Sequence, residues 1–109
     1  MTDKLSIQQI PAARTVLALL NTFEDLPAAT SWSVDLIPSA HYALGVAIAV
    51  HGDDEAFEAW RSALGLVRES MRRREHTGYY TLTGSTEVEG VPVELTGYLN
   101  HPAALRSGL

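Results

Sequence analysis

The sequence predicts an α+β fold, a two-layer sandwich in which two helices lie on one face of a four-stranded antiparallel sheet. A helical apolar spacing followed by two strand-like segments occurs over residues 10–50 and again over residues 53–99, which gives the order α-β-β-α-β-β. Short turns join successive strands, and this favours antiparallel neighbours. The two copies share almost no residues, so duplication and coincidence both remain open.

Composition limits the class of protein. The 109 residues suit one domain, and 46% apolar content with a net charge of −5 is ordinary for a globular chain. There is no cysteine, which excludes disulfides and thiol chemistry. Residues 1–9 lack the apolar run of a signal peptide. We expect a flexible N-terminal arm (1–9), a single domain (10–99), a short C-terminal tail (100–109), no membrane contact and a cytoplasmic location.

The first predicted helix has Pro11 in its first turn, where the missing N–H is tolerated. The helix should end before Pro27, because a residue that precedes proline avoids helical angles. Residues 31–37 then alternate as a strand, and Pro38-Ser39-Ala40 is typical of a turn. The expected buried stripe of the helix is Ile10, Ala13, Val16, Leu17, Leu20 and Phe23, widened by Leu19.

Residues 41–50 form the strongest predicted strand, because this segment is apolar on both faces. One face has large side chains, namely Tyr42, Leu44, Val46, Ile48 and Val50. The other face has small ones, namely Ala43, Gly45, Ala47 and Ala49. Such a strand needs a cover on each side. The helices supply one cover. We expect a partner subunit on the small-residue face, with a helix as the alternative cover.

The second predicted helix begins at a cap formed by Asp53 or Asp54. Gly65 ends the helix, or the helix continues past this defect to about residue 72. Residues 68–77 are strongly hydrophilic and indicate a helix end followed by a loop. The expected buried stripe is Ala56, Phe57, Trp60, Ala63, Leu64 and Val67.

Residues 79–88 and 91–99 are predicted to form a hairpin around Glu89-Gly90. This turn places Val88 opposite Val91 and Tyr80 opposite Leu99. The outward face then contains a stripe of tyrosine and threonine, which we consider a possible recognition face: Tyr79, Thr81, Thr83, Thr96 and Tyr98. Ordinary strand formers on a solvated sheet explain the same residues.

No catalytic or metal-binding pattern stands out. The histidines are His41, His51, His76 and His101. His41 and His51 lie at opposite ends of one predicted strand, about 33 Å apart at about 3.3 Å per residue, so they cannot share a metal. His51 with Asp53 and Asp54 offers ligand atoms, but a strand end and a helix cap account for them. Thr83-Gly84-Ser85 lies inside a strand rather than in a nucleophile elbow. We predict no catalytic residues, metal or cofactor.

The one basic cluster consists of Arg68, Arg72, Arg73 and Arg74. It is a possible contact for a phosphate backbone or an acidic protein. A solvated helix end accounts for it without any ligand, since cations complement the helix dipole. The acidic balance of the chain and the lack of interleaved aromatic residues disfavour nucleic acid.

Residues 26–99 resemble a set of small uncharacterised proteins from actinobacteria and their phages or mobile elements. The resembling features are Leu26-Pro27 before Trp32-x-Val34, the apolar strand ending at Val50, the run of residues 56–65, and the hairpin segment of residues 90–93. These motifs are structural and imply no activity. The repeated helix-strand-strand order is also similar to that of small acidic secretion-chaperone-like folds, which are commonly dimeric.

We therefore expect a non-enzymatic protein-interaction or accessory module that self-associates as a homodimer and that has other protein partners. One alternative is a small-molecule-binding protein or enzyme with a pocket between helices and sheet, near His41, His51 or Asp35. Another alternative is a nucleic-acid-associated regulator that acts through the arginine cluster.

Overall fold

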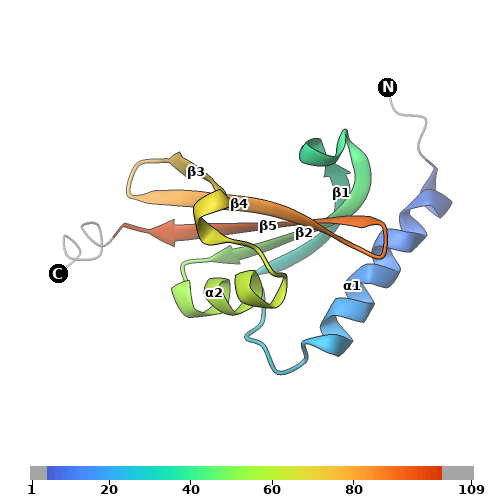
Figure 1. Cartoon of the computed structure of the whole chain (residues 1–109), viewed down its shortest axis with the longest axis horizontal. Coiled ribbons are helices and arrows are strands. Elements are labelled where there is room, and N and C mark those ends of the chain that lie inside the picture. The colour runs from blue at the N-terminus through green and yellow to red at the C-terminus, as the bar shows by residue number, and fades with distance from the viewer. Residues whose placement is uncertain (1–4, 102–109) are drawn as a thin grey trace.

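The structure is a computed structural model that describes residues 5–101. The elements are η1 (Ser6–Gln9), α1 (Ile10–Thr22), β1 (Ser31–Ile37), η2 (Pro38–Ala40), β2 (Ala43–His51), α2 (Asp54–Ala63), η3 (Arg68–Ser70), β3 (Arg72–Glu75), β4 (Tyr79–Val88) and β5 (Val91–Asn100). The α+β class with two α-helices is confirmed, and Figure 1 shows both helices on one side of the sheet.

The sheet has five strands in the order β1-β2-β5-β4-β3, and it is mixed. At its centre β2 and β5 run parallel, with Val46 beside Val93 and Val50 beside Gly97, while the other neighbours are antiparallel. A parallel pair needs a long crossover, which the segment containing α2 provides. The predicted four-stranded antiparallel sheet was therefore wrong in strand number and in its central pairing.

The fifth strand is β3, which forms where we predicted a helix end and loop. Its four residues pair antiparallel with β4, with Arg72 opposite Thr83 and Glu75 opposite Tyr80. All four side chains are charged and exposed. Charged residues are typical of a short edge strand, because they discourage further strand pairing.

The predicted hairpin register of β4 and β5 is confirmed, from Val88 opposite Val91 to Tyr80 opposite Leu99. Both turn residues have positive φ, 48° at Glu89 and 82° at Gly90. A two-residue turn with this geometry matches the right-handed twist of the strands it joins. The local sequence was therefore enough to set this pairing.

The connection from β1 to β2 is tighter than expected. The predicted turn at Pro38-Ser39-Ala40 is the 3₁₀ turn η2, and β2 begins only at Ala43. His41 and Tyr42, which we had placed in the strand, have φ angles of 55° and 59°. Left-handed backbone is incompatible with a strand, so these two residues belong to the turn.

Helix α1 buries a different stripe from the predicted one. Ala12, Thr15 and Leu19 are its buried residues. Thr15 is tolerated there because its hydroxyl donates to the Pro11 carbonyl at 3.0 Å. Four residues of the predicted stripe, Ile10, Ala13, Leu17 and Leu20, are exposed instead. The helix is apolar around more of its circumference than the sheet can cover.

Helix α2 provides the centre of the core. Asp53 is its N-cap and accepts a hydrogen bond from the Ala56 N–H at 2.9 Å. Phe57 and Trp60 are almost fully buried, whereas Val67, which we placed in the same stripe, is exposed. The Trp60 indole N–H donates to the Pro27 carbonyl at 2.7 Å, which ties the α1–β1 loop to this helix.

The two ends of the domain differ from the predicted boundaries. Ser6–Gln9, part of the predicted arm, forms the exposed 3₁₀ helix η1, and Asn100, part of the predicted tail, ends β5. Residues 1–4 and 102–109 lie outside the described residues. Within residues 5–101, no helix has the length and apolar character needed to cross a membrane.

Gly97→Ala tests the packing of α2 on the sheet. A Cβ at position 97 would lie 2.4 Å from Cδ1 of Phe57, so the ring must shift. We expect the free energy of unfolding to fall by about 1–3 kcal/mol in chemical denaturation. Phe57→Leu combined with Gly97→Ala should cost less than the two single changes added together. Full additivity would contradict the contact.

Asp53→Ala tests the cap of α2, and Asp54→Ala is its matched control. Asp53→Ala should lower the free energy of unfolding by about 1 kcal/mol, because the Ala56 N–H loses its acceptor. Asp54→Ala removes the same charge without removing the cap and should cost about 0.3 kcal/mol. Thermal unfolding compares the two. Equal losses would show that charge, not capping, stabilises this helix end.

Candidate functional site

The sheet face opposite the helices, here called the helix-free face, brings together most of the predicted site residues. Strand register determines which side chains share it. Ala49 of β2, Thr96 of β5, Thr83 of β4 and Arg72 of β3 form one row across the sheet. The parallel row contains His51, Tyr98, Thr81 and Arg74. The small-residue stripe, the tyrosine–threonine stripe and two of the four predicted arginines are therefore contiguous.

The β3–β4–β5 half of this face contains an open hollow of about 610 Å³. Hydroxyl groups form its floor, since the Thr83 and Thr96 Oγ1 atoms lie 3.2 Å apart. Arginines lie along the β3 edge and aromatic residues at one end. The hollow is lined by Arg72, Arg73, Arg74, His76, Thr81, Thr83, Glu94, Thr96 and Tyr98.

The two outward tyrosines are each stacked on a histidine. Tyr98 lies against His51 with ring centroids 4.1 Å apart, and Tyr79 lies against His76 at 4.5 Å. Both pairs are nearly parallel, at 11° and 7°. Stacking restricts the rings, so this end of the face offers a pre-ordered aromatic surface.

The predicted basic cluster is divided between the two sides of the sheet. Arg72 and Arg74 share the helix-free face with the threonines. Arg73 also borders the hollow, but its guanidinium lies on the other side of the sheet, 3.9 Å from the centre of the Tyr80 ring. Within residues 5–101, Arg73 and Arg68 form ion pairs, but no carboxylate lies within 4.0 Å of Arg72 or Arg74.

Arg68 belongs to a separate network on the helix side. It pairs with Glu58 of α2 and donates to the Tyr80 hydroxyl at 3.1 Å. Hydrogen bonding from Arg61 lowers the pKa of Glu58, and Arg68 adds to this effect against the opposing influence of burial. This network links α2 to the segment before β3, and Arg68 is not available to the helix-free face.

The small-residue stripe of β2 is partly covered by its own chain. A Cβ at Gly45 would lie 2.4 Å from the Pro92 carbonyl oxygen and 2.8 Å from Cγ1 of Ile37. Ile37 therefore closes over Gly45, and the Ser39 hydroxyl of η2 reaches Ser85 of β4 at 3.2 Å. Half-buried positions remain at Ala43, Ala47 and Ala49.

Glu94 is a component of the site that the sequence reasoning missed. It lies on the helix-free face beside Ala47, and it is partly buried. Burial raises the pKa of Glu94, the nearby Arg72 opposes this, and Asp35 adds to it. The outward position of Glu94 in the alternation of β5 was the available signal. The alternation does not show which residues surround Glu94, because these depend on the strands that flank β5.

Within residues 5–101, His76 and Thr81 are the histidine and hydroxyl that meet on this face. His76 approaches the Thr81 hydroxyl only at 3.4 Å, and in residues 5–101 no carboxylate orients the imidazole. A hydroxyl nucleophile requires a closely bonded base. His41 is exposed in its turn, and His101 pairs with Glu75 at 2.8 Å. Nowhere in the described part do three His, Asp or Glu side chains gather to hold a metal.

Glu94→Gln tests the electrostatics of the hollow. Because the folded-state pKa of Glu94 is raised, the native state binds this proton more tightly than the unfolded chain does. At a pH above the raised pKa, the folded wild type carries a partly buried charge that lowers its free energy of unfolding. This loss disappears as the pH falls below the unfolded pKa of about 4.3. Glu94→Gln should be more stable than wild type near pH 7, with a smaller difference near pH 4.

Glu87→Gln, the same change at an exposed position on this face, is the control for unfolding measured across pH. A Glu94→Gln variant less stable than wild type at neutral pH would mean that attraction to Arg72 outweighs burial.

Comparisons with protein-family models, with curated proteins and with solved structures found no match for this chain.

Proposed function

We propose that this chain is a non-enzymatic protein-interaction module whose helix-free face binds an acidic segment of a protein partner. The observation that supports this is the pair Arg72 and Arg74, which lie at the rim of the hollow without a carboxylate partner in residues 5–101. Charged hydrogen bonds to carboxylates are worth about 1.5–3 kcal/mol each when well formed.

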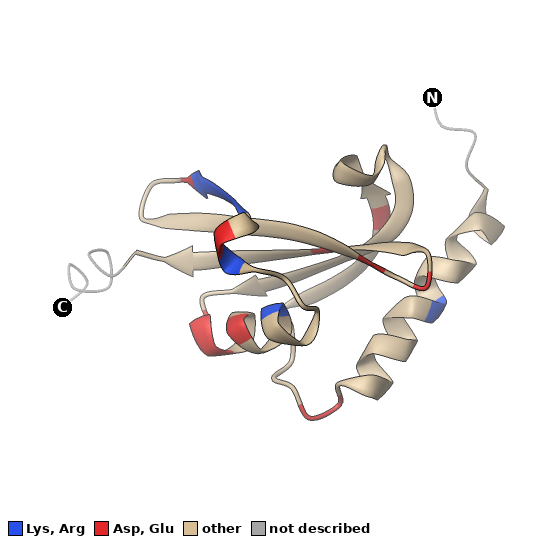
Figure 2. Ribbon diagram, in the orientation of Figure 1, with Lys and Arg blue, Asp and Glu red and all other residues tan. Residues whose placement is uncertain are grey.

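The charge distribution supports an acidic partner despite the net charge of −5. Figure 2 shows the arginines of β3 and the acidic residues of α2 as separate groups. Asp54 and Glu55 lie in the first turn of α2, on the helix-covered side of the sheet. An acidic ligand on the helix-free face thus meets Arg72 and Arg74 before it meets most of the protein's own carboxylates.

The threonine rows and the stacked tyrosines support a peptide rather than a nucleic acid. Hydroxyls of Thr81, Thr83 and Thr96 can donate to or accept from a peptide backbone. Nucleic-acid binding generally needs an extended basic surface. Only two of the four predicted arginines lie on this face, and Glu94 lies between them and β2.

The test is binding of a fluorescently labelled oligoglutamate peptide, measured by anisotropy in about 50 mM salt, where the Debye length is long. The Arg72→Gln/Arg74→Gln variant should bind at least about tenfold more weakly than wild type, which corresponds to about 1.4 kcal/mol. Binding should also weaken as salt is added.

Two single variants form the matched pair for this test. Arg72→Gln and Arg73→Gln change the net charge equally and lie in the same strand, but they point to opposite faces. Only Arg72→Gln should weaken binding. Equal losses would indicate a nonspecific charge effect, and tighter binding of a single-stranded DNA oligonucleotide than of the peptide would overturn the proposed partner class.

A further inference from the structure

The two edges of the sheet are built differently. The β3 edge has four residues, all of them charged. The β1 edge has seven residues, of which Asp35 alone is charged, and its outer side pairs with no other strand in the described part of the chain. Natural sheets usually block such an edge with charge, proline or a bulge. The β1 edge lacks these devices apart from Asp35.

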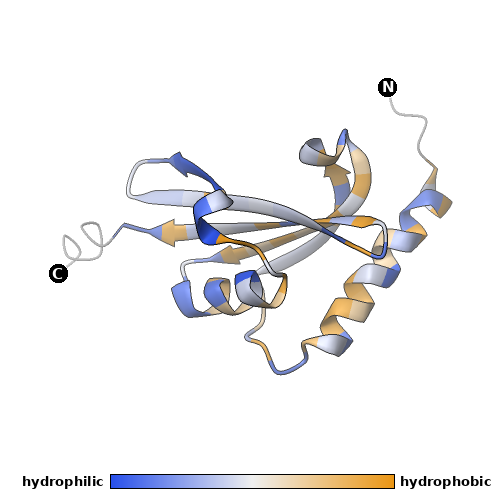
Figure 3. Ribbon diagram, viewed as in Figure 1, coloured by the Kyte–Doolittle hydropathy of each residue, from blue (hydrophilic) through white to orange (hydrophobic). Residues whose placement is uncertain are grey.

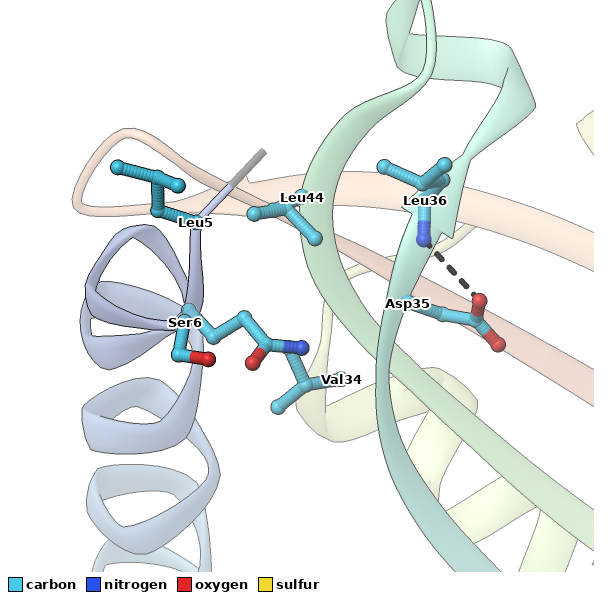
Figure 4. Close-up of a pocket in the computed structure, with 7 residues that line it drawn as sticks. Leu5, Ser6, Val34, Asp35, Leu36 and Leu44 are labelled. Carbon is cyan, nitrogen blue, oxygen red and sulfur yellow. Dashed lines mark hydrogen bonds between the residues drawn. The ribbon is translucent and has the colours of Figure 1, made fainter. Parts of the chain in front are cut away.

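The backbone of Leu36 shows which groups point away from the sheet. Its N–H donates to the Asp35 side chain at 3.1 Å rather than to a neighbouring strand (Figure 4). In an antiparallel strand, the N–H and C=O of one residue point to the same side, and every second residue shares that side. The backbone groups of Trp32 and Val34 therefore also point outward, ready for a further strand.

Exposed apolar side chains flank this edge on the helix-covered side. Leu5 is 65% exposed and Leu36 37%, and both line an open groove with Val34 and Leu44 (Figure 4). Figure 3 shows that much of α1 is apolar. Four exposed residues of α1 are apolar, namely Ile10, Ala13, Leu17 and Leu20.

The exposed stripe of α1 lies on the side of the helix that is nearer to β1. Leu20 lines a hollow together with Trp32 of β1, whereas the other flank of α1, at Arg14 and Ala18, borders the β4–β5 turn. Leu17 is 62% exposed and Leu20 42%. A cover for the β1 edge that also extended over α1 would bury these side chains together.

We propose that β1 pairs antiparallel with β1 of a second copy across a two-fold axis at Val34, which joins the two sheets into one. This inference is independent of ligand binding on the helix-free face. In the pairing, Val34 lies opposite its own counterpart, and each Leu36 packs against Trp32 of the other copy. A two-fold contact must be self-complementary, and this register satisfies that condition.

Charge complementarity favours a second copy as the occupant. Asp35 lies opposite Ser33 of the other copy, so no two carboxylates face each other, and the serine hydroxyl can replace the Leu36 N–H as a hydrogen-bond donor to Asp35. Two acidic chains can therefore meet here without facing like charges.

The spacing of strands and helices is also consistent with this pairing. Strands lie about 4.8 Å apart, so the two copies of β2 would be about 14 Å apart across the paired β1 strands. Helix α1 packs on β2, and a helix with its side chains is about 10–12 Å wide. Two α1 helices would then lie side by side with Leu17 and Leu20 filling the space between them.

The absence of cysteine permits a direct test by cysteine substitution. In the proposed register the two Val34 Cα atoms are about 5.5 Å apart, within the range of a disulfide. Val34→Cys should form a covalent dimer when diamide oxidises the two thiols. Leu36→Cys, on the same strand and face, should not form this dimer. Each Leu36 lies two residues from the two-fold axis, in opposite directions along the paired strands, so the two positions are about 13 Å apart. Arg73→Cys on the opposite edge should not either.

The mass in solution provides the second measurement. Sedimentation equilibrium at micromolar concentration should give twice the chain mass of 11.8 kDa for wild type and the chain mass for Leu36→Lys, with circular dichroism confirming that the variant is folded. A monomeric wild type would overturn the proposal, including the case in which the edge instead accepts an extended peptide from another protein. Equal crosslinking of Val34→Cys, Leu36→Cys and Arg73→Cys would also overturn it.

Discussion

The close contact between Phe57 and Gly97 is the constraint on which the rest of the fold depends. Because position 97 has no side chain, the Phe57 ring can lie directly against β5. This seats α2 beneath the centre of the sheet, where β5 runs parallel to β2. The Trp60 indole then reaches Pro27 and Trp32, so the same helix also positions the start of β1.

Because both helices lie on one side, the other side of the sheet is left without a helical cover. Side chains there are short near β2 and polar near β3, β4 and β5, so the face is recessed where the hydroxyls lie and charged along one rim. The Arg68–Glu58 network on the helix side uses a different part of the basic cluster for structure. The alternation of strand side chains therefore places one run of arginines on two sides of the sheet.

The sequence predicted what depends on local pattern and missed what depends on long-range contacts. The β4–β5 register followed from the alternation and from the Glu89-Gly90 turn. The parallel pairing of β2 and β5 did not, because nothing local specifies which strand becomes the neighbour. β3 was missed because backbone pairing, rather than apolar side chains, forms it. For the same reason the sequence showed neither the split of the arginines nor the surroundings of Glu94.

The parallel central pair also constrains the order in which the chain can fold. Val46 of β2 pairs with Val93 of β5, which lies almost half the chain length further on. During synthesis the first half of the chain supplies only α1 and the β1–β2 hairpin, without the α2 and β5 residues that complete the core. Its apolar surface stays open until the last strand has been made. Contacts between such distant segments slow folding, so this small domain should behave kinetically like a larger one and should need protection from aggregation while nascent.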